Sequence, residues 1–190
     1  MARAGVTRAA VLARCEELVD ERGLEGLSLA EVAASLGIRQ PSLYKHVAGQ
    51  ADVVREISAR ARHALAGELA AAAVGRSRDD AVRAVAVAYR RWALAHPGRY
   101  SATVRAPDPD DAAGIRASAE VVDVVLAVLA GYGLRGDDAI DATRALRAGL
   151  HGFASIELAG GFGLPQDRDH SYTRLVDLLI AGLSAAASPG

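Results

Sequence analysis

A short polar segment in the first quarter of the chain carries side chains that can bind nucleic acid. A glutamine amide can form two hydrogen bonds with an adenine edge, and serine or histidine can bond bases or phosphates. Lysine and arginine pair with phosphate, and Lys45 is the only lysine among 22 basic residues. The segment therefore suits hydrogen bonding to base edges and ion pairing with phosphates. Its polar residues are Arg39, Gln40, Ser42, Tyr44, Lys45 and His46.

The apolar residues of the same segment indicate which of its faces is free. Leu43 and Val47 lie four positions apart, so a helix places both on one side. We expect them to face a small core, while the polar residues project from the opposite side. The phenol of Tyr44 can then bond a phosphate while its ring packs on the domain. The expected core partners are Leu18, Leu29, Val32 and Leu36.

Capping signals predict the first helix, from Arg8 to Arg22. Thr7 can accept a hydrogen bond at its N-terminus, and Gly23 can adopt the left-handed conformation that ends a helix. Apolar residues recur along this helix at helical spacing, so one of its sides should be buried.

Two short helices are expected next. Ser28 and Glu31 have the spacing of a capping box, in which each side chain bonds the other residue's amide. Gly37 then allows a tight reversal, and Pro41 favours the start of a third helix over residues 40–47. The pair has the length and turn chemistry of a helix-turn-helix, whose second helix enters the DNA major groove.

The rest of the chain should also be helical, because alanine is abundant and no stretch has the alternation typical of strands. We expect helices over about 51–73, 78–95, 111–130, 137–159 and 171–186, with a short turn around Tyr100. The predicted fold is all-α. A three-helix helix-turn-helix DNA-binding domain is expected over residues 1–50, and a helical bundle for ligand binding and dimerisation over residues 51–190.

The first quarter of the chain resembles the DNA-binding domain of TetR-family transcriptional regulators, over T-R-A-A-V-L-A-R-C-E-E-L-V-D-E-R-G-L-E-G-L-S-L-A-E-V-A-A-S-L-G-I-R-Q-P-S-L-Y-K-H-V. Its most distinctive part, G-I-R-Q-P-S-L-Y-K-H-V, is similar to a recognition helix of that family. The resemblance implies a homodimer with recognition helices about 34–36 Å apart on a palindromic operator in double-stranded DNA. It places Gln40, Pro41 and Tyr44 near bases. It places Ser42 and His46 on phosphates.

Two positions depart from the family pattern. Ala30 stands where tetracycline repressors have a base-reading arginine, and Gln50 stands where many members have a phosphate-binding lysine. The operator sequence therefore does not transfer from the family. We expect Lys45 and Arg39 to supply the missing positive charge.

The C-terminal region resembles the ligand-binding domain of a TetR subfamily, the WHG type, over L-H-G-F-A-S-I-E-L-A-G-G-F-G-L-P and L-V-D-L-L-I-A-G-L. Small residues recur on one side of the helix over 137–159, which allows a second helix to approach closely. The last helix is apolar on almost every side, so we expect its own domain and a second copy to bury it. The expected residues of this homodimer interface are Ala145, Gly149, Gly152, Ile156, Leu175, Leu179 and Leu183.

An aromatic and apolar stripe on the helix over 78–95 marks a candidate effector pocket. All-helical domains hold ligand cavities between such a stripe and its neighbours. We hypothesise that a small apolar effector binds there and changes the angle of the helix over 51–73. A stripe at this spacing is also typical of an ordinary core, which is the alternative for each residue alone. The candidate ligand-binding residues are Tyr89, Trp92, His96, Tyr100, Val125, Leu129, Leu150, His151 and Phe153.

Composition and the other motifs argue against several classes of protein. A net charge of −1 excludes a protein that is positively charged over its whole surface and binds nucleic acid in that way. The 51% of hydrophobic residues predict a folded core. The single cysteine, Cys15, fits a reducing cytoplasm, and the longest apolar run is too short to span a membrane. The N-terminal segment becomes charged too early for a signal peptide.

No catalytic residue, cofactor or metal site is expected. The run G-Y-G-L-R-G matches a dinucleotide fingerprint but follows an apolar helix instead of a strand, so it is an inter-helix turn. The acidic run D-P-D-P-D-D lacks the glycine and glutamate of a calcium loop. His151 and Glu157 lie six positions apart without a second histidine, which does not fit a helical metal site.

The sequence therefore predicts a ligand-responsive transcriptional regulator, a repressor that a small apolar effector releases from its operator, and not an enzyme. Two alternatives from other classes remain. One is an all-helical enzyme that uses the C-terminal cavity, and the other is a helical module that binds protein. A steep fall of affinity with salt would favour DNA binding over the interaction module.

Overall fold

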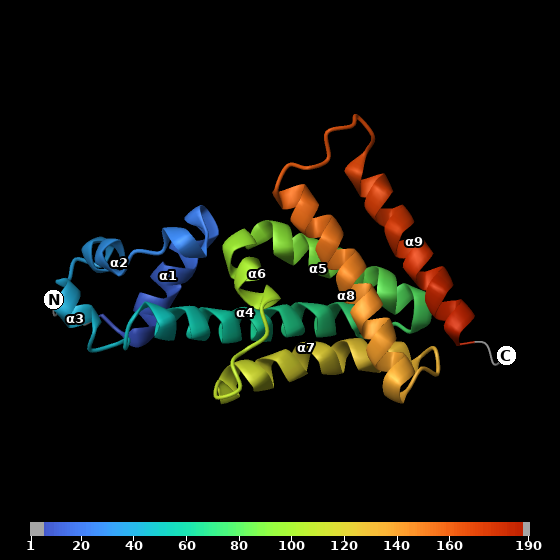
Figure 1. Cartoon of the computed structure of the whole chain (residues 1–190), viewed down its shortest axis with the longest axis horizontal. Coiled ribbons are helices and arrows are strands. Elements are labelled where there is room, and N and C mark those ends of the chain that lie inside the picture. The colour runs from blue at the N-terminus through green and yellow to red at the C-terminus, as the bar shows by residue number, and fades with distance from the viewer. Residues whose placement is uncertain (1–5, 188–190) are drawn as a thin grey trace. The chain divides into compact units, whose positions relative to one another are not determined.

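The computed structural model describes residues 6–187, and every regular element within that range is helical (Figure 1). The predicted all-α class is confirmed. Residues 1–5 and 188–190, the outer ends of the two predicted domain ranges, lie outside the described residues. The elements are α1 (Arg8–Arg22), a 3-10 turn η1 (Leu24–Gly26), α2 (Leu29–Ser35), α3 (Gln40–Leu43), α4 (Gln50–Ala73), α5 (Arg78–Ala95), α6 (Pro97–Val104), α7 (Ala112–Ala130), α8 (Gly136–Leu158) and α9 (Arg168–Ala186).

The local signals placed most helix ends correctly. The hydroxyl of Thr7 accepts from the Ala10 amide at 3.2 Å, and Gly23 ends α1 with a φ of 76°. The five long helices predicted after residue 50 are all present, with ends shifted by at most three residues. Helix ends depend on caps and breakers close by in the sequence, which explains this agreement.

The capping box is only half formed. Ser28 Oγ accepts from the Glu31 amide at 3.4 Å, as predicted. The Glu31 carboxylate does not return the bond but pairs with Arg22 Nη1 at 2.6 Å. A guanidinium within reach competes with the backbone amide for the same carboxylate, and the charged donor makes the stronger bond.

Two predictions about short elements were wrong. The region of Tyr100 was expected to be a turn, but it lies in the two-turn helix α6, because a proline that ends one helix is also favoured in the first turn of the next. The third helix was expected over 40–47 but ends at Leu43. Bonds from the Lys45 amide to Ser42 and from the His46 amide to Leu43 continue it as tighter turns.

The chain packs as two compact units, which are described separately. Among the described residues, unit 1 consists of 6–63 with 96–118, and unit 2 of 64–95 with 119–187. Unit 1 includes the first half of α4 and residues 96–118, which the predicted ranges assign to the C-terminal domain, so the units do not follow a single boundary after residue 50. Buried residues from five helices meet in the core of unit 1, among them Val19, Val32, Leu43, Ile57 and Ala102.

Within unit 1, α6 is attached to both α1 and α4. Gly98 allows a close approach to α1, since a Cβ there would lie 1.8 Å from the Val19 carbonyl oxygen. Asp20 accepts from the Arg99 amide at 2.8 Å and from Arg99 Nε at 2.6 Å. On the other side, Ser58 Oγ of α4 donates to the Ala102 carbonyl at 2.7 Å. Movement of α6 would therefore act on two helices of this unit at once.

Unit 2 is built from α5, α8, α9, and the adjoining parts of α4 and α7. Trp92, Leu129 and Ala154 are almost fully buried in it. A glycine lets α8 and α9 pack closely, since a Cβ on Gly149 would lie 3.1 Å from Leu179 Cδ1. Within the described residues, no helix is long and apolar enough to cross a bilayer.

Candidate nucleic-acid interface

The recognition segment, residues 39–47, has one buried and one exposed face. Leu43 and Val47 have exposed fractions of 0% and 2%, which confirms that they face inward. The predicted core partners surround them, with Leu36 partly buried and the others fully buried. They are Leu18, Leu29, Val32 and Leu36.

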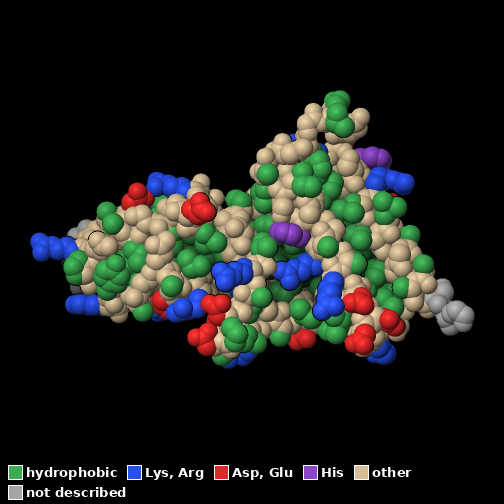
Figure 2. Space-filling model, in the orientation of Figure 1, with side chains coloured by type: hydrophobic (Ala, Val, Ile, Leu, Met, Phe, Trp, Pro, Cys, Tyr) green, Lys and Arg blue, Asp and Glu red, His purple; other side chains and the backbone are tan. Residues whose placement is uncertain are grey.

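The polar face of the recognition segment is open to solvent. Tyr44 is 49% exposed, and its hydroxyl accepts from Gln40 Nε2 at 3.3 Å. Basic side chains project at the end of unit 1 where α2 and α3 lie (Figure 2). The predicted DNA-binding residues thus occupy one short surface segment. Arg39, Gln40, Pro41, Tyr44 and Lys45 are exposed, and Ser42 and His46 are half-buried.

A contact that the sequence did not reveal anchors the end of this segment. Arg8 Nη1 donates to the His46 carbonyl oxygen at 2.5 Å, and Arg8 Nη2 contacts Glu56 at 3.2 Å. The Glu56 hydrogen bond is the main cause that raises the pKa of Arg8. Asp52 lies 3.5 Å from Arg8 and accepts from the Ala48 amide at 3.0 Å. These partners are 38 to 48 positions apart, too far for any local spacing rule.

The predicted effector residues fall into both units. Within unit 2, Trp92, Leu129 and Leu150 are buried, and Tyr89, Val125, His151 and Phe153 are half-buried. Within unit 1, Tyr100 is buried and His96 is half-buried near Asp20 and Arg99. The pKa of His151 is lowered by burial and by the charge of Arg147, which favours a neutral imidazole.

An open groove of about 690 Å³ lies elsewhere in unit 2, between α4 and α5. None of the predicted effector residues lines it. Its walls include Glu68, Arg76, Arg83, Val87 and Arg91, so its surface mixes charges of both signs with small apolar side chains. Arg91 already pairs with Glu68 at 2.8 Å.

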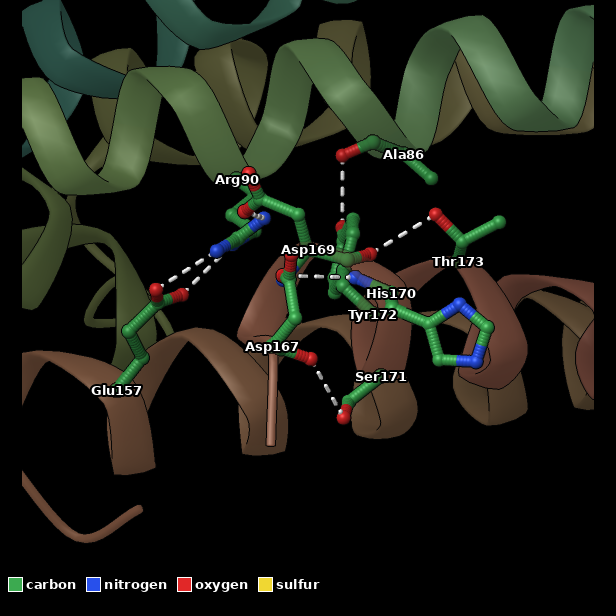
Figure 3. A network of polar contacts seen from close by, with 9 residues as sticks. All are labelled: Ala86, Arg90, Glu157, Asp167, Asp169, His170, Ser171, Tyr172 and Thr173. Atoms are coloured by element: carbon green, nitrogen blue, oxygen red, sulfur yellow. Dashed lines mark hydrogen bonds and ion pairs between the residues drawn. The ribbon is translucent and has the colours of Figure 1, made fainter. Parts of the chain in front are cut away.

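A polar network of unit 2 joins α5, α8 and α9 (Figure 3). Arg90 donates to both carboxylate oxygens of Glu157 at 2.6 and 2.7 Å and to Asp169 at 2.7 Å. Its guanidinium lies 5.0 Å from the Tyr172 ring centroid and 5.6 Å from that of Phe153. The hydrogen bond from Arg90 holds the pKa of Glu157 below its usual value. The sequence spacing of Glu157, six positions from His151, raises only the question of a metal ligand and does not reveal this role.

Some residues of the predicted dimer interface are already used within the chain. Leu175 and Leu179 lie over Gly149 of the same molecule, where a Cβ on that glycine would come within 3.7 Å of both, and Leu183 is buried. Gly152 is half-buried, while Ala145 and Ile156 are exposed. One chain does not bury α9 completely, because Leu178 is 67% exposed. No cluster of potential metal ligands occurs among residues 6–187.

Comparison with known proteins identifies the family. Residues 82–179 match the family model described as tetracyclin repressor-like, C-terminal domain. The chain is 36% identical to an uncharacterized HTH-type transcriptional regulator of Mycobacterium tuberculosis, with 98% of this chain and 86% of that protein aligned. It is 30% identical to another such regulator of Bacillus subtilis, over 95% of this chain and 94% of that protein.

The fold is also found in solved structures. A TetR variant from Acinetobacter baumannii, crystallised in complex with minocycline, superposes with a TM-score of 0.73 at 20% identity, over 97% of this chain and 100% of that one. Both relatives, which span nearly the whole chain, are named HTH-type transcriptional regulators. The chain therefore belongs to the TetR family of helix-turn-helix transcriptional regulators.

Proposed function

We propose that this regulator is a repressor that binds a palindromic operator as a homodimer and leaves it when a small apolar effector binds. The observation that carries the proposal is the exposed polar face of the recognition segment, which lies opposite the buried Leu43 and Val47. A short helix held by one apolar face and open on the other is the arrangement that enters a major groove.

In the proposed complex, Gln40, Pro41 and Tyr44 approach bases. Ser42 and His46 hold phosphates, and Lys45 and Arg39 add phosphate contacts in place of the lysine that is absent at position 50. The hydrogen bond from Gln40 to Tyr44 supports a shared role, because it aligns two side chains of the exposed face.

The dimer is proposed to form through α8 and α9. Ile156 and Leu178 expose large apolar side chains on these helices, with exposed fractions of 46% and 67%. Covering such side chains with the same helices of a second copy would remove apolar area from water.

The effector is proposed to act through the helices around Trp92. The solved complex with minocycline supports this, because a relative of the same fold holds a small molecule. The attachment of α6 to α1 and α4 through Gly98, Asp20 and Ser58 supports transmission to the recognition segment. A changed angle of α4 would alter the separation of the two recognition segments in a dimer.

Selection of bound fragments from random duplexes, followed by sequencing, tests DNA binding, palindromy and half-site spacing together. The selected duplex then serves for salt titrations, in which log affinity should fall by about 0.9 per contacted phosphate for each unit of log salt. Lys45→Ala should reduce this slope by about one. A flat salt response without sequence preference would contradict the proposal, and so would a monomer at micromolar concentration in sedimentation.

Ligand binding is tested separately. Titrated apolar compounds should quench the fluorescence of Trp92, the only tryptophan, and weaken binding to the selected duplex. Compounds that quench without loosening DNA would contradict release by the effector.

A further inference from the structure

We infer that Arg8 is a positioning residue for operator recognition, holding the end of the recognition segment against the start of α4. The inference deepens the proposed function and depends on it. It assigns to Arg8 an effect on sequence discrimination and not a contact with DNA.

The Arg8 guanidinium joins the end of the recognition segment to the first turns of α4, which follow it along the chain. Its Nη1 donates to the His46 carbonyl at 2.5 Å, and its Nη2 reaches Glu56 on α4 at 3.2 Å. The planar fork of arginine can bond two acceptors in fixed directions, whereas a lysine ammonium acts as a point charge. A substitution to lysine therefore keeps the charge but loses the bridge.

The neighbouring backbone is held from the other side. Asp52 accepts from the Ala48 amide at 3.0 Å and also lies 3.5 Å from Arg8. Between these anchors, Gly49 has a φ of 149°, a conformation that L residues rarely adopt. The backbone between the recognition segment and α4 is thus held by Arg8 at the His46 carbonyl and by Asp52 at the Ala48 amide.

The recognition segment needs such an anchor because its own helix is short. α3 has four residues and is followed by turns in which the amides of residues 45–47 bond back to Ser42 and Leu43. A helix of this length has almost no intrinsic stability, so tertiary contacts set its orientation. Leu43 and Val47 hold its inner face, but Arg8 holds the backbone at the end where Tyr44, Lys45 and His46 project.

The charges around Arg8 argue against a direct phosphate contact. One guanidinium faces two carboxylates, those of Asp52 and Glu56, so the cluster has a net charge of −1. A phosphate approaching this cluster would meet repulsion that cancels the attraction of the arginine. Specific recognition requires side chains in register with base edges, whereas non-specific binding requires only positive charge.

The test compares full-length Arg8→Ala, Arg8→Lys and Glu56→Ala with wild type, on the selected operator and on an unrelated duplex over a range of salt. Arg22→Ala is the matched control, since Arg22 also lies on α1 and pairs with an exposed carboxylate, Glu31. Both Arg8 variants should bind the operator about tenfold more weakly than wild type. Their affinity for the unrelated duplex, and the slope of log affinity against log salt, should stay unchanged. Glu56→Ala should also discriminate less between the operator and the unrelated duplex. This loss is expected although the removal of a negative charge would by itself favour binding to DNA. Arg22→Ala should change neither.

Hydrogen exchange of the free protein gives a second readout. The amides of residues 45–48 should exchange faster in both Arg8 variants than in Arg22→Ala. The far-ultraviolet circular dichroism of all three variants should equal that of wild type, because their helix content is unchanged. A salt slope reduced by about one with equal weakening of both duplexes would instead identify Arg8 as a phosphate contact and overturn the inference. Unchanged operator affinity would overturn it as well. Absence of any preferred duplex for wild type would mark failure of the proposed function itself.

Discussion

The packing of α6 on α1 in unit 1 depends on the absence of a side chain at Gly98. At Gly98, an added Cβ would lie 1.8 Å from the Val19 carbonyl oxygen and 2.8 Å from the Asp20 amide nitrogen. Ordinary contacts between carbon and a carbonyl oxygen are about 3.3 Å or longer, so Gly98→Ala requires a relative shift of about 1.5 Å. The obstacle is backbone, which cannot rotate away as a side chain does. The same shift would disturb the bonds from Arg99 to Asp20.

Overpacking of this kind costs about 3 kcal/mol, the upper part of the usual range, because backbone must move. For a chain of this length, each kcal/mol lowers the melting temperature by about 2–4 °C, so we expect a loss of about 6–12 °C. Urea titration and thermal melting followed by circular dichroism measure both quantities. Gly67→Ala is the matched control. It lies in α4 with open space around the added Cβ, and it should stabilise the protein by up to about 1 kcal/mol.

The two variants make the same chemical change in a helix, so their difference isolates the packing of α6 on α1. If the Gly98→Ala protein melts at or above the wild-type temperature, the close approach does not exist in solution. The proposed route from α6 to the recognition segment would then lose its support.

Three further predictions concern single side chains. Arg90→Ala should lower the free energy of unfolding by about 3 kcal/mol in urea titration, because it leaves the Glu157 carboxylate without its bidentate partner. The side chain of Glu157 is only 8% exposed, so water cannot easily replace that partner. A change below about 0.5 kcal/mol would contradict this. The pKa of Glu157 is lowered in the folded protein, so its ionised form stabilises the fold fully above the ordinary value of 4.5, and this stabilisation is lost as the pH falls below that value. In Glu157→Gln, the free energy of unfolding should therefore depend less on pH in this range. An unchanged slope of the free energy against pH would argue against the pairing. Burial raises the pKa of Cys15 to about 11, so a thiol reagent at pH 8 should leave the native protein unmodified and react completely in denaturant.

Much of the recognition segment could be predicted from sequence. The spacing of Leu43 and Val47 identified its buried face, and Thr7 and Gly23 marked the ends of α1. The length of α3 could not be predicted in this way, since Pro41 indicates where a helix starts but nothing nearby in the sequence specifies its last turn. The helix α6 was missed because His-Pro-Gly marks both the end of one helix and the start of another.

The sequence by itself determined the all-helical class, the family and the inward and outward faces of the recognition segment. The helical class and the two faces follow from caps, breakers and apolar spacing within a few residues, which act before the chain packs, whereas the family follows from the resemblance of whole segments. Only the tertiary structure decided which arginines became anchors. Twenty-one arginines are nearly equivalent in the sequence, yet Arg8 reaches His46 across 38 positions and Arg90 reaches Glu157 across 67. Such pairs arise from the directions in which packed helices aim long side chains, and no local pattern encodes those directions.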